Sequence, residues 1–293
     1  MHFPFVGETK DLDEDARGFA PGAFIRLCAG QTHYGIAGPH DGRVVVLIHG
    51  IAGPMGIWEP LAHSLASNGF RVLYYDLFGR GYSDRPVSSY DIDLFIAQLR
   101  DLISGLSIAI PVTLVGWSLG GMISGTYAVE FPGEVDRLVL IAPAGIEVSL
   151  PTISRLGMIP ILGDIIMSVL GRRIVLRSVS NGLYKKDLEE TFLSLVTDQM
   201  QYRGYLRAFL STMRSCGYED VSEVYRKAGS DNLPVLLISG SEDPSIPSSV
   251  QGKLRELIPD LKHHEIVDTG HFPHYERPEE VTSRIIEFLH SEV

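Results

Sequence analysis

The stretch VTLVGWSLGG, residues 112–121, decides the fold of this chain. The run VTLV indicates a short buried strand, and the residues after Leu119 follow a helical pattern. Ser118 then stands on a very tight turn between strand and helix, where side chains at Gly116 and Gly120 would collide. Such a turn, a nucleophile elbow, lifts the Ser118 hydroxyl clear of the carboxyl-terminal edge of a sheet, the edge at which open α/β sheets bind ligands.

The segments around this turn alternate between strand and helix patterns. Helices between the strands place apolar residues on one face at helical spacing, as in residues 92–103. This alternation implies parallel strands in a sheet that is covered by helices on both faces, and so an α/β fold. Strands are predicted at residues 43–50, 71–79, 112–116, 135–143, 234–240 and 262–270.

Between residues 147 and 231 the alternation stops and only helical patterns remain. A separate helical domain is one interpretation, but a cap is preferred because the sheet is interrupted and then completed. The predicted organisation is therefore a core of residues 1–146 and 232–293 with a helical cap, or lid, of residues 147–231. Its apolar residues are expected partly to pack on the core and partly to line a substrate cavity. They are Leu156, Ile159, Leu162, Ile166, Leu193, Leu206 and Phe209.

Composition excludes several classes of protein. The net charge of −11, from 36 acidic and 25 basic residues, argues against a nucleic-acid-binding protein. Two cysteines and an amino end without a signal-peptide pattern predict a cytoplasmic protein with reduced thiols. The most apolar tract, residues 156–171, is broken by Pro160 and is shorter than the roughly 20 residues of a membrane span. We expect no membrane span, and a monomer or homodimer.

A serine nucleophile needs a base and an acid that orients the base. The loop after the strand at 234–240 provides Asp243, with Glu242 as a competing neighbour and Asp268 as a more distant candidate. His271 follows the last predicted strand and is the candidate base, and His274 competes with it. No H-E-x-x-H or paired C-x-x-C motif is present, so the sequence predicts neither a metal site nor a cofactor.

The oxyanion of an acyl-transfer intermediate also needs hydrogen-bond donors. One is the Leu119 N–H, directly after the serine, and the other is expected from the Ile51 N–H in the loop IHGIAGPMG, residues 48–56. Gly50 and Gly53 allow that backbone to approach the substrate, whereas His49 is expected to stabilise the loop.

Five motifs in this order, VVVLIHG, DLFGRGYSDRP, GWSLGG, SGSEDPSIP and TGHFPHYERP, resemble the α/β-hydrolase superfamily, in its serine carboxylesterase and lipase-like branch. The resemblance covers nearly the whole chain. It implies a catalytic triad of Ser118 as nucleophile, Asp243 as acid and His271 as base, with the Ile51 and Leu119 amides as oxyanion hole. Asp243 matches the family's G-x-x-D-x-x-x-P spacing and Glu242 does not. The turn at residues 79–86 also matches and is interpreted as architecture.

The serine excludes relatives of this fold that use an aspartate nucleophile, and the elbow differs from the G-G-S-W-G of prolyl aminopeptidases. The resemblance implies a serine hydrolase that cleaves small carboxylic esters with an apolar acyl or alcohol part through an acyl-enzyme, as a carboxylesterase or monoacylglycerol-type lipase. Hydrolases of C–C bonds in ring-cleavage products, perhydrolases and hydroxynitrile lyases share the triad and stay open. A non-catalytic small-molecule receptor on this fold is the alternative from another class.

Overall fold

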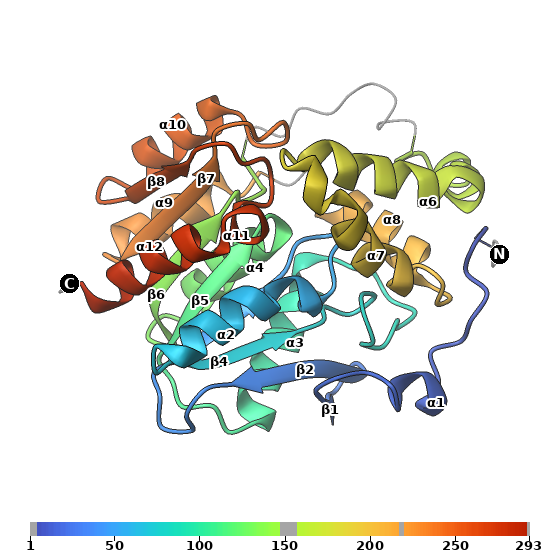
Figure 1. Cartoon of the computed structure of the whole chain (residues 1–293), viewed down its shortest axis with the longest axis horizontal. Coiled ribbons are helices and arrows are strands. Elements are labelled where there is room, and N and C mark those ends of the chain that lie inside the picture. Colours follow the sequence, from blue (N-terminus) through green and yellow to red (C-terminus); the bar gives the residue numbers. More distant parts are fainter. Residues whose placement is uncertain (1–4, 147–156, 217–219, 292–293) are drawn as a thin grey trace.

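The computed structural model describes residues 5–146, 157–216 and 220–291, and its centre is one eight-stranded sheet (Figure 1). The strand order is β1-β2-β4-β3-β5-β6-β7-β8, and β3 to β8 pair in parallel. The strands are β1 Ala23–Arg26, β2 Gln31–Ala37, β3 Val44–Ile48, β4 Arg71–Tyr75, β5 Val112–Trp117, β6 Val135–Ile141, β7 Val235–Gly240 and β8 Lys262–Ile266. The predicted α/β fold with a mostly parallel sheet is confirmed. The strands β1 and β2, which pair antiparallel, were not predicted.

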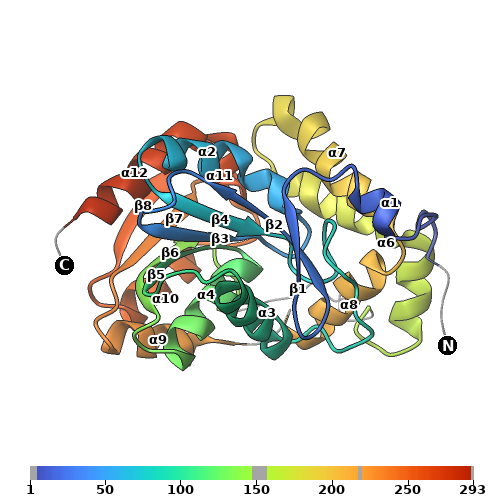
Figure 2. The same cartoon turned by 90° about the horizontal axis from the view of Figure 1, so that it is seen from below.

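Helices cover both faces of the sheet (Figure 2). On β3, Val46 and Ile48 pack in the apolar cluster shared with α3 and α4, while Val45 and Leu47 pack in the cluster shared with α2 and α12. Burial on both faces explains why these strands are continuous apolar runs without alternation. The covering helices are α2 Glu59–Ser67, α3 Ile92–Gly105, α4 Leu119–Glu130, α9 Ser222–Ser230, α10 Ser248–Leu257, α11 Pro273–Glu276 and α12 Pro278–His290.

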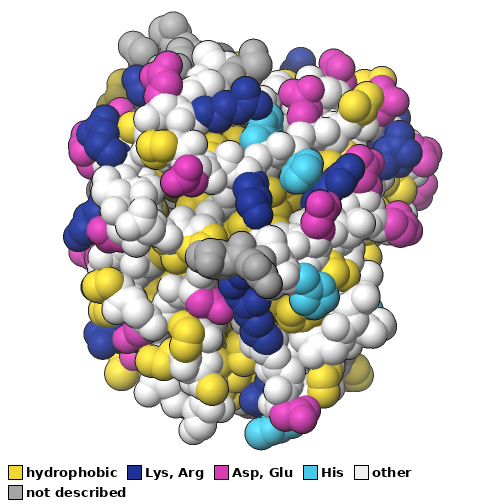
Figure 3. Space-filling model, turned by 90° about the vertical axis from the view of Figure 1, so that its left-hand side faces the viewer, with side chains coloured by type: hydrophobic (Ala, Val, Ile, Leu, Met, Phe, Trp, Pro, Cys, Tyr) yellow, Lys and Arg dark blue, Asp and Glu magenta, His cyan; other side chains and the backbone are white. Residues whose placement is uncertain are grey.

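The sheet ends at β8, whose open side belongs to the face shown in Figure 3. On this face Lys and Arg side chains are interspersed with Asp, Glu and His. Lys262 and Glu265 of β8 are exposed, as is typical of edge strands protected against pairing with another chain.

Between β6 and β7 the described residues form four α-helices, which divide into two groups (Figure 1). Three of them are α6 Leu162–Gly182, α7 Glu189–Gln199 and α8 Tyr205–Ser215, and α6 packs on both α7 and α8 beyond the end of the sheet. The fourth, α9, packs on α4 and α10 instead. We therefore propose a cap of α6 to α8 and assign α9, which lies inside the predicted 147–231 boundary, to the core.

The insertion leaves the sheet and returns to it at neighbouring points. The Val221 N–H donates a hydrogen bond of 2.8 Å to the Gly145 carbonyl oxygen. The Tyr225 hydroxyl, on α9, donates to the Ala144 carbonyl at 3.0 Å. The two ends of the insertion are thus fastened together at its base.

The amino-terminal segment fastens the other side of the three-helix group. The Glu8 carboxylate accepts hydrogen bonds from the N–H groups of Gly204 and Leu206 at 2.8 and 2.7 Å, at the start of α8. The Val6 N–H donates to the Ser168 carbonyl of α6 at 2.8 Å. Burial raises the pKa of Glu8 above its ordinary value. The segment connects α6 and α8 to the edge of the sheet that carries β1.

Gly120→Ala is expected to destabilise the protein, because a Cβ at this position would lie 2.0 Å from the Ile48 carbonyl oxygen. The obstructing atom is backbone, so α4 would have to move away from β3, at a cost of roughly 3 kcal/mol. Thermal unfolding followed by circular dichroism should show a midpoint lower by several degrees. Gly252→Ala in α10 is the matched control: its Cβ meets no atom within 4 Å, so its midpoint should stay the same or rise. Equal midpoints for the two variants would contradict the statement that the Ile48 carbonyl oxygen leaves no room for a side chain at Gly120.

Candidate active site

Ser118 occupies the turn between β5 and α4 with φ 54° and ψ −116°. A non-glycine residue at positive φ is uncommon and strained, so the surrounding structure has to hold it. The Ser118 N–H donates to the Ile141 carbonyl, and the Ser118 carbonyl accepts from the Ala144 N–H, each at 3.0 Å. These bonds fix the serine at the carboxyl end of β5, beside the end of β6.

His271 and Asp243 are brought together at the same edge. The His271 Nδ1 lies 2.9 Å from the Asp243 Oδ2. The other carboxylate oxygen of Asp243 accepts hydrogen bonds from the N–H groups of Ser245 and Ile246 at 2.7 and 3.1 Å. The carboxylate is therefore held in one orientation, with one oxygen on its own loop and the other on the imidazole.

The competing carboxylates lie elsewhere. Glu242 is exposed, and its carboxylate is 3.4 Å from the Ser241 hydroxyl. Asp268 is also exposed, with Tyr184 and Arg277 as its partners at 3.5 and 3.9 Å. Neither carboxylate contacts the His271 ring.

His274, the competing histidine, is buried between Trp58 and Trp117, at ring distances of 4.4 and 5.1 Å. Burial lowers the pKa of His274 to about 3, so the ring is neutral. Within the described part of the chain, neither ring nitrogen of His274 has a hydrogen-bond partner. His274 therefore packs between two tryptophans, and no carboxylate orients its ring as the base of a triad would require.

Trp117 connects the serine to the histidine loop. Its indole N–H donates a hydrogen bond of 2.8 Å to the His271 carbonyl oxygen, and the two rings are 5.5 Å apart. Ser118 follows directly in sequence. Among the described residues the Ser118 hydroxyl has no hydrogen bond of its own, and catalytic bonds of this kind often tighten only when substrate is bound.

The predicted oxyanion loop lies against the nucleophile. A Cβ on Gly50 would be 2.8 Å from the Trp117 ring and 3.1 Å from the Ser118 Cβ, so only glycine allows this approach. His49 connects this loop to the next one: its Nδ1–H donates to the Gly50 carbonyl and its Nε2 accepts from the Leu77 N–H. Burial lowers the pKa of His49 to about 4, which keeps it in the neutral form that these two bonds require.

Three buried side chains that sequence reasoning missed hold the same loop. The Arg80 Nε donates to the Ile51 carbonyl at 3.1 Å. The Gln199 side-chain amide and the Tyr205 hydroxyl donate to the Ala52 carbonyl at 2.7 and 3.1 Å. Gln199 and Tyr205 belong to α7 and α8, so the helical insertion is hydrogen-bonded to the loop that carries the Ile51 N–H.

Arg80 comes from the turn at residues 79–86, which was interpreted as architecture. It is fully buried, burial lowers its pKa, and its remaining donors reach the Phe78 carbonyl and the Thr212 hydroxyl of α8. All of these acceptors are backbone carbonyls or a buried hydroxyl, so Arg80 holds the loop in place. The motif gave a signal for Arg80, whereas nothing in the sequence singled out Gln199 or Tyr205.

A fourth residue that was not predicted, Glu276, connects the insertion to the histidine loop. Its carboxylate accepts from the N–H groups of Tyr184 and Lys185 at 2.9 and 2.7 Å, just after α6, and from the Gly270 N–H at 2.9 Å. The His271 N–H donates to the Gly182 carbonyl at 2.8 Å. The end of α6 is thus joined to the His271 loop twice, by a direct backbone bond and through the buried Glu276 carboxylate.

Gln199→Leu is expected to lower kcat/KM for ester substrates by about 10- to 100-fold. The variant leaves the Ala52 carbonyl with one donor fewer and the Gly81 N–H without its 2.8 Å acceptor, so the oxyanion loop loses its anchor on α7. Steady-state kinetics on a p-nitrophenyl ester measures the effect. Gln201→Leu, two residues later, is the control, since its amide donates only to the Asp198 carbonyl. Similar losses in both variants would show that the Ala52 bond does not support catalysis.

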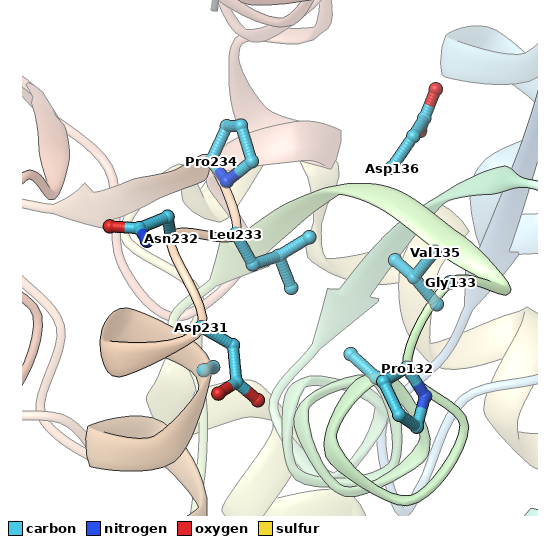
Figure 4. A pocket seen from close by; sticks show the side chains of 10 residues that line it. Pro132, Gly133, Val135, Asp136, Asp231, Asn232, Leu233 and Pro234 are labelled. Carbon is cyan, nitrogen blue, oxygen red and sulfur yellow. The ribbon is translucent and has the colours of Figure 1, made fainter.

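A pocket of about 260 Å³ lies away from this site (Figure 4). Pro132 and Val135 line one side of it and Leu233 and Pro234 the other, at the amino ends of β6 and β7. Ser118 emerges at the carboxyl ends of the strands. The pocket is therefore on the opposite edge of the sheet from the predicted triad.

No group of three or more His, Cys, Asp or Glu side chains in residues 5–146, 157–216 and 220–291 is arranged to hold a metal ion. In the same ranges, no helix combines the length and apolar character needed to cross a membrane.

Comparison with known proteins shows the family of the chain. A model of the alpha/beta hydrolase family matches residues 45–284. A 2-hydroxy-6-oxo-6-(2'-aminophenyl)hexa-2,4-dienoic acid hydrolase of Metapseudomonas resinovorans is 26% identical over 97% of this chain and 96% of its own. An uncharacterized protein of Mycobacterium tuberculosis is 29% identical over 81% of this chain and 72% of its own.

Among solved structures, the enol-lactonase of Burkholderia xenovorans LB400 superposes with a TM-score of 0.79 at 21% identity, covering 92% of this chain and 100% of the lactonase. This likeness concerns the fold, which has the same sheet and flanking helices. The family match spans the serine turn, the Asp243 loop and the His271 loop. The chain belongs to the alpha/beta hydrolase family.

Proposed function

We propose that the protein hydrolyses carboxylic esters through an acyl-enzyme formed on Ser118. The observation that carries the proposal is the 2.9 Å bond between His271 Nδ1 and Asp243 Oδ2 at the edge where the strained Ser118 turn emerges. A histidine whose Nδ1–H is held by a carboxylate presents Nε2 as a general base. A serine that is next to such a base becomes nucleophilic at neutral pH.

The reaction follows from these roles. The Ser118 Oγ attacks the ester carbonyl carbon while His271 Nε2 takes its proton, and the N–H groups of Ile51 and Leu119 stabilise the oxyanion. The C–O bond then breaks, and the alcohol leaves with the proton from His271. Water, deprotonated by the same nitrogen, attacks the acyl-enzyme and releases the acid and free Ser118.

The proposed cap is expected to set chain-length preference. Of the apolar residues predicted to serve it, Leu206 is buried in the apolar core, Ile159 and Leu162 are exposed, and Leu156 lies outside the described residues. The half-buried members remain as candidates for the cavity wall. They are Ile166, Leu193 and Phe209.

Leu193→Trp is therefore expected to lower kcat/KM for octanoate esters while sparing acetate esters, because added bulk shortens an apolar pocket. Each methylene excluded changes selectivity by about 1–3 kcal/mol, so the loss should grow with acyl length. Rates on p-nitrophenyl acetate, butyrate and octanoate measure it, with Ser194→Trp, exposed on the same helix, as control. A folded variant with equal losses on all three esters would place chain-length selection elsewhere.

Hydrolysis of C–C bonds is the second candidate, because the Metapseudomonas relative, named as a dienoic acid hydrolase, is similar over nearly the full length of both chains. The deciding experiment compares turnover of p-nitrophenyl butyrate with turnover of a vinylogous ring-cleavage diketone. Faster ester turnover supports the proposal, and a diketone preference replaces it with the second candidate. Absence of turnover on both, with binding retained, would point to a receptor.

A further inference from the structure

The outer face of α6 is an apolar surface with no partner among the described residues. The buried side of the helix repeats every four residues through Met167, Gly171, Val175 and Val179. On the opposite side, large apolar side chains are between 41% and 62% exposed. This outer face comprises Leu162, Ile165, Val169, Leu170 and Ile174.

Such exposure is concentrated in this one place. Fourteen large apolar residues are exposed in the described part of the chain, and seven of them fall within residues 159–174. The other seven are spread singly over the surface, as is ordinary for a folded protein. A contiguous apolar face bordered by charge marks a surface that binds something.

The charge on the same face is positive. Arg173 follows Val169 by four residues and Arg177 follows Arg173 by four, so both arginines continue the outer face, and both are exposed. The only acidic residue of α6, Asp164, is paired with Arg214 at 3.0 Å. The outer face of α6 is therefore positively charged, although the chain as a whole has a net charge of −11. The mixed charges on the face of β8 and α10 contrast with it (Figure 3).

We propose that the outer face of α6 binds the surface of an anionic phospholipid bilayer. Apolar side chains of an amphipathic helix lie at the boundary of headgroups and acyl chains, while arginines pair with phosphates. Figure 1 places α6 at the periphery of the molecule, and the helix is accessible along its length. This binding does not depend on hydrolysis. If the proposed ester hydrolysis holds, it brings the enzyme to a surface where amphiphilic esters collect.

Charge complementarity favours a lipid surface over a second copy of the chain. In a symmetric dimer that pairs the two α6 helices antiparallel along their length, the middle of one α6 faces the middle of the other. The helix runs from Leu162 to Gly182, so Arg173 lies next to its midpoint and would face the partner copy's Arg173. In an anionic bilayer, lipid phosphates can instead pair with both Arg173 and Arg177. The acyl chains can contact the apolar side chains of the first turns of α6.

The test is cosedimentation of the full chain with extruded vesicles of phosphatidylcholine alone or of phosphatidylcholine with 30% phosphatidylglycerol. We expect binding to the anionic vesicles only, weakened by 0.5 M NaCl through screening. The double variant Arg173→Gln and Arg177→Gln should bind about 30-fold more weakly, roughly fivefold per arginine. Ile165→Ser with Val169→Ser should lose at least about tenfold. Val87→Ser and Arg26→Gln, exposed outside α6, are controls that should bind like wild type.

Unchanged melting temperatures would show that the variants fold, and vesicle binding is read without any turnover, so it is independent of the proposed function. Equal binding to both kinds of vesicle, or double variants that bind like wild type, would overturn the proposal. Absence of vesicle binding would also overturn it. If sedimentation velocity then shows a dimer for the wild type and a monomer for the Ile165→Ser and Val169→Ser variant, the face binds a second copy of the chain.

Discussion

Ser118→Ala is expected to abolish ester hydrolysis, lowering kcat by on the order of 10⁶. Alanine cannot form the acyl-enzyme, and an intact His271 and Asp243 cannot compensate, because the members of such a triad act as a unit. The fold should be unaffected: within the described residues the Ser118 hydroxyl makes no hydrogen bond, and its backbone is held at Ile141 and Ala144.

Initial rates on p-nitrophenyl butyrate, with the melting temperature measured alongside, make this test. Ser124→Ala, on the helix α4 that follows Ser118, is the matched control; its hydroxyl donates only to the Gly120 carbonyl at 2.6 Å, so it should remain active. Retention of more than a few per cent of wild-type activity by Ser118→Ala, with contaminating esterase excluded, would remove Ser118 from the nucleophile position.

The second large effect is expected from Asp243→Asn, which should lower kcat by roughly 10⁴. An asparagine keeps the shape of the carboxylate and can still accept from the Ser245 and Ile246 amides through its carbonyl oxygen. Its NH₂ group would then face His271 Nδ1. A donor there selects the wrong tautomer of the imidazole and removes the charge that stabilises the imidazolium.

Glu242→Gln is the control for this variant, because its carboxylate is exposed and has the Ser241 hydroxyl as its partner. Its kcat should fall by less than about threefold, as for an exposed charge. A larger loss in Glu242→Gln than in Asp243→Asn would move the acid of the triad by one residue.

The sheet was predictable where strands are buried on both faces, since runs such as Val44–Ile48 follow directly from that burial. The strands β1 and β2 lie at the sheet edge, are short or partly polar, and gave no such pattern. The helix α9 was predicted as helical, but its pattern does not reveal which surface its buried Tyr225 and Ala228 will meet. That choice depends on α4, about 100 residues earlier.

The predicted triad and oxyanion residues depend on local motifs, and the structure brings Asp243, His271 and the Ser118 turn to one edge. The residues that were missed act through distant contacts. Gln199 reaches Ala52 across 147 positions, and Glu276 reaches Tyr184 across 92. A glutamine in a helical pattern is ordinarily a solvated surface residue, and Glu276 stands in the motif TGHFPHYERP without a feature that marks it as buried, so only the folded chain distinguishes these two.

The bond between Val221 and Gly145 brings the two ends of the helical insertion to one point of the core. Because the chain departs and returns across a single hydrogen bond, a segment of any length can bridge that gap without changing strand register, and loop-closure entropy rises only slowly with length. The side-chain contacts of the insertion restrict such an exchange more than its two ends do. A transplanted segment would have to supply its own donors to the Ala52 carbonyl and its own N–H groups to the Glu276 carboxylate, so these contacts would change together with the segment.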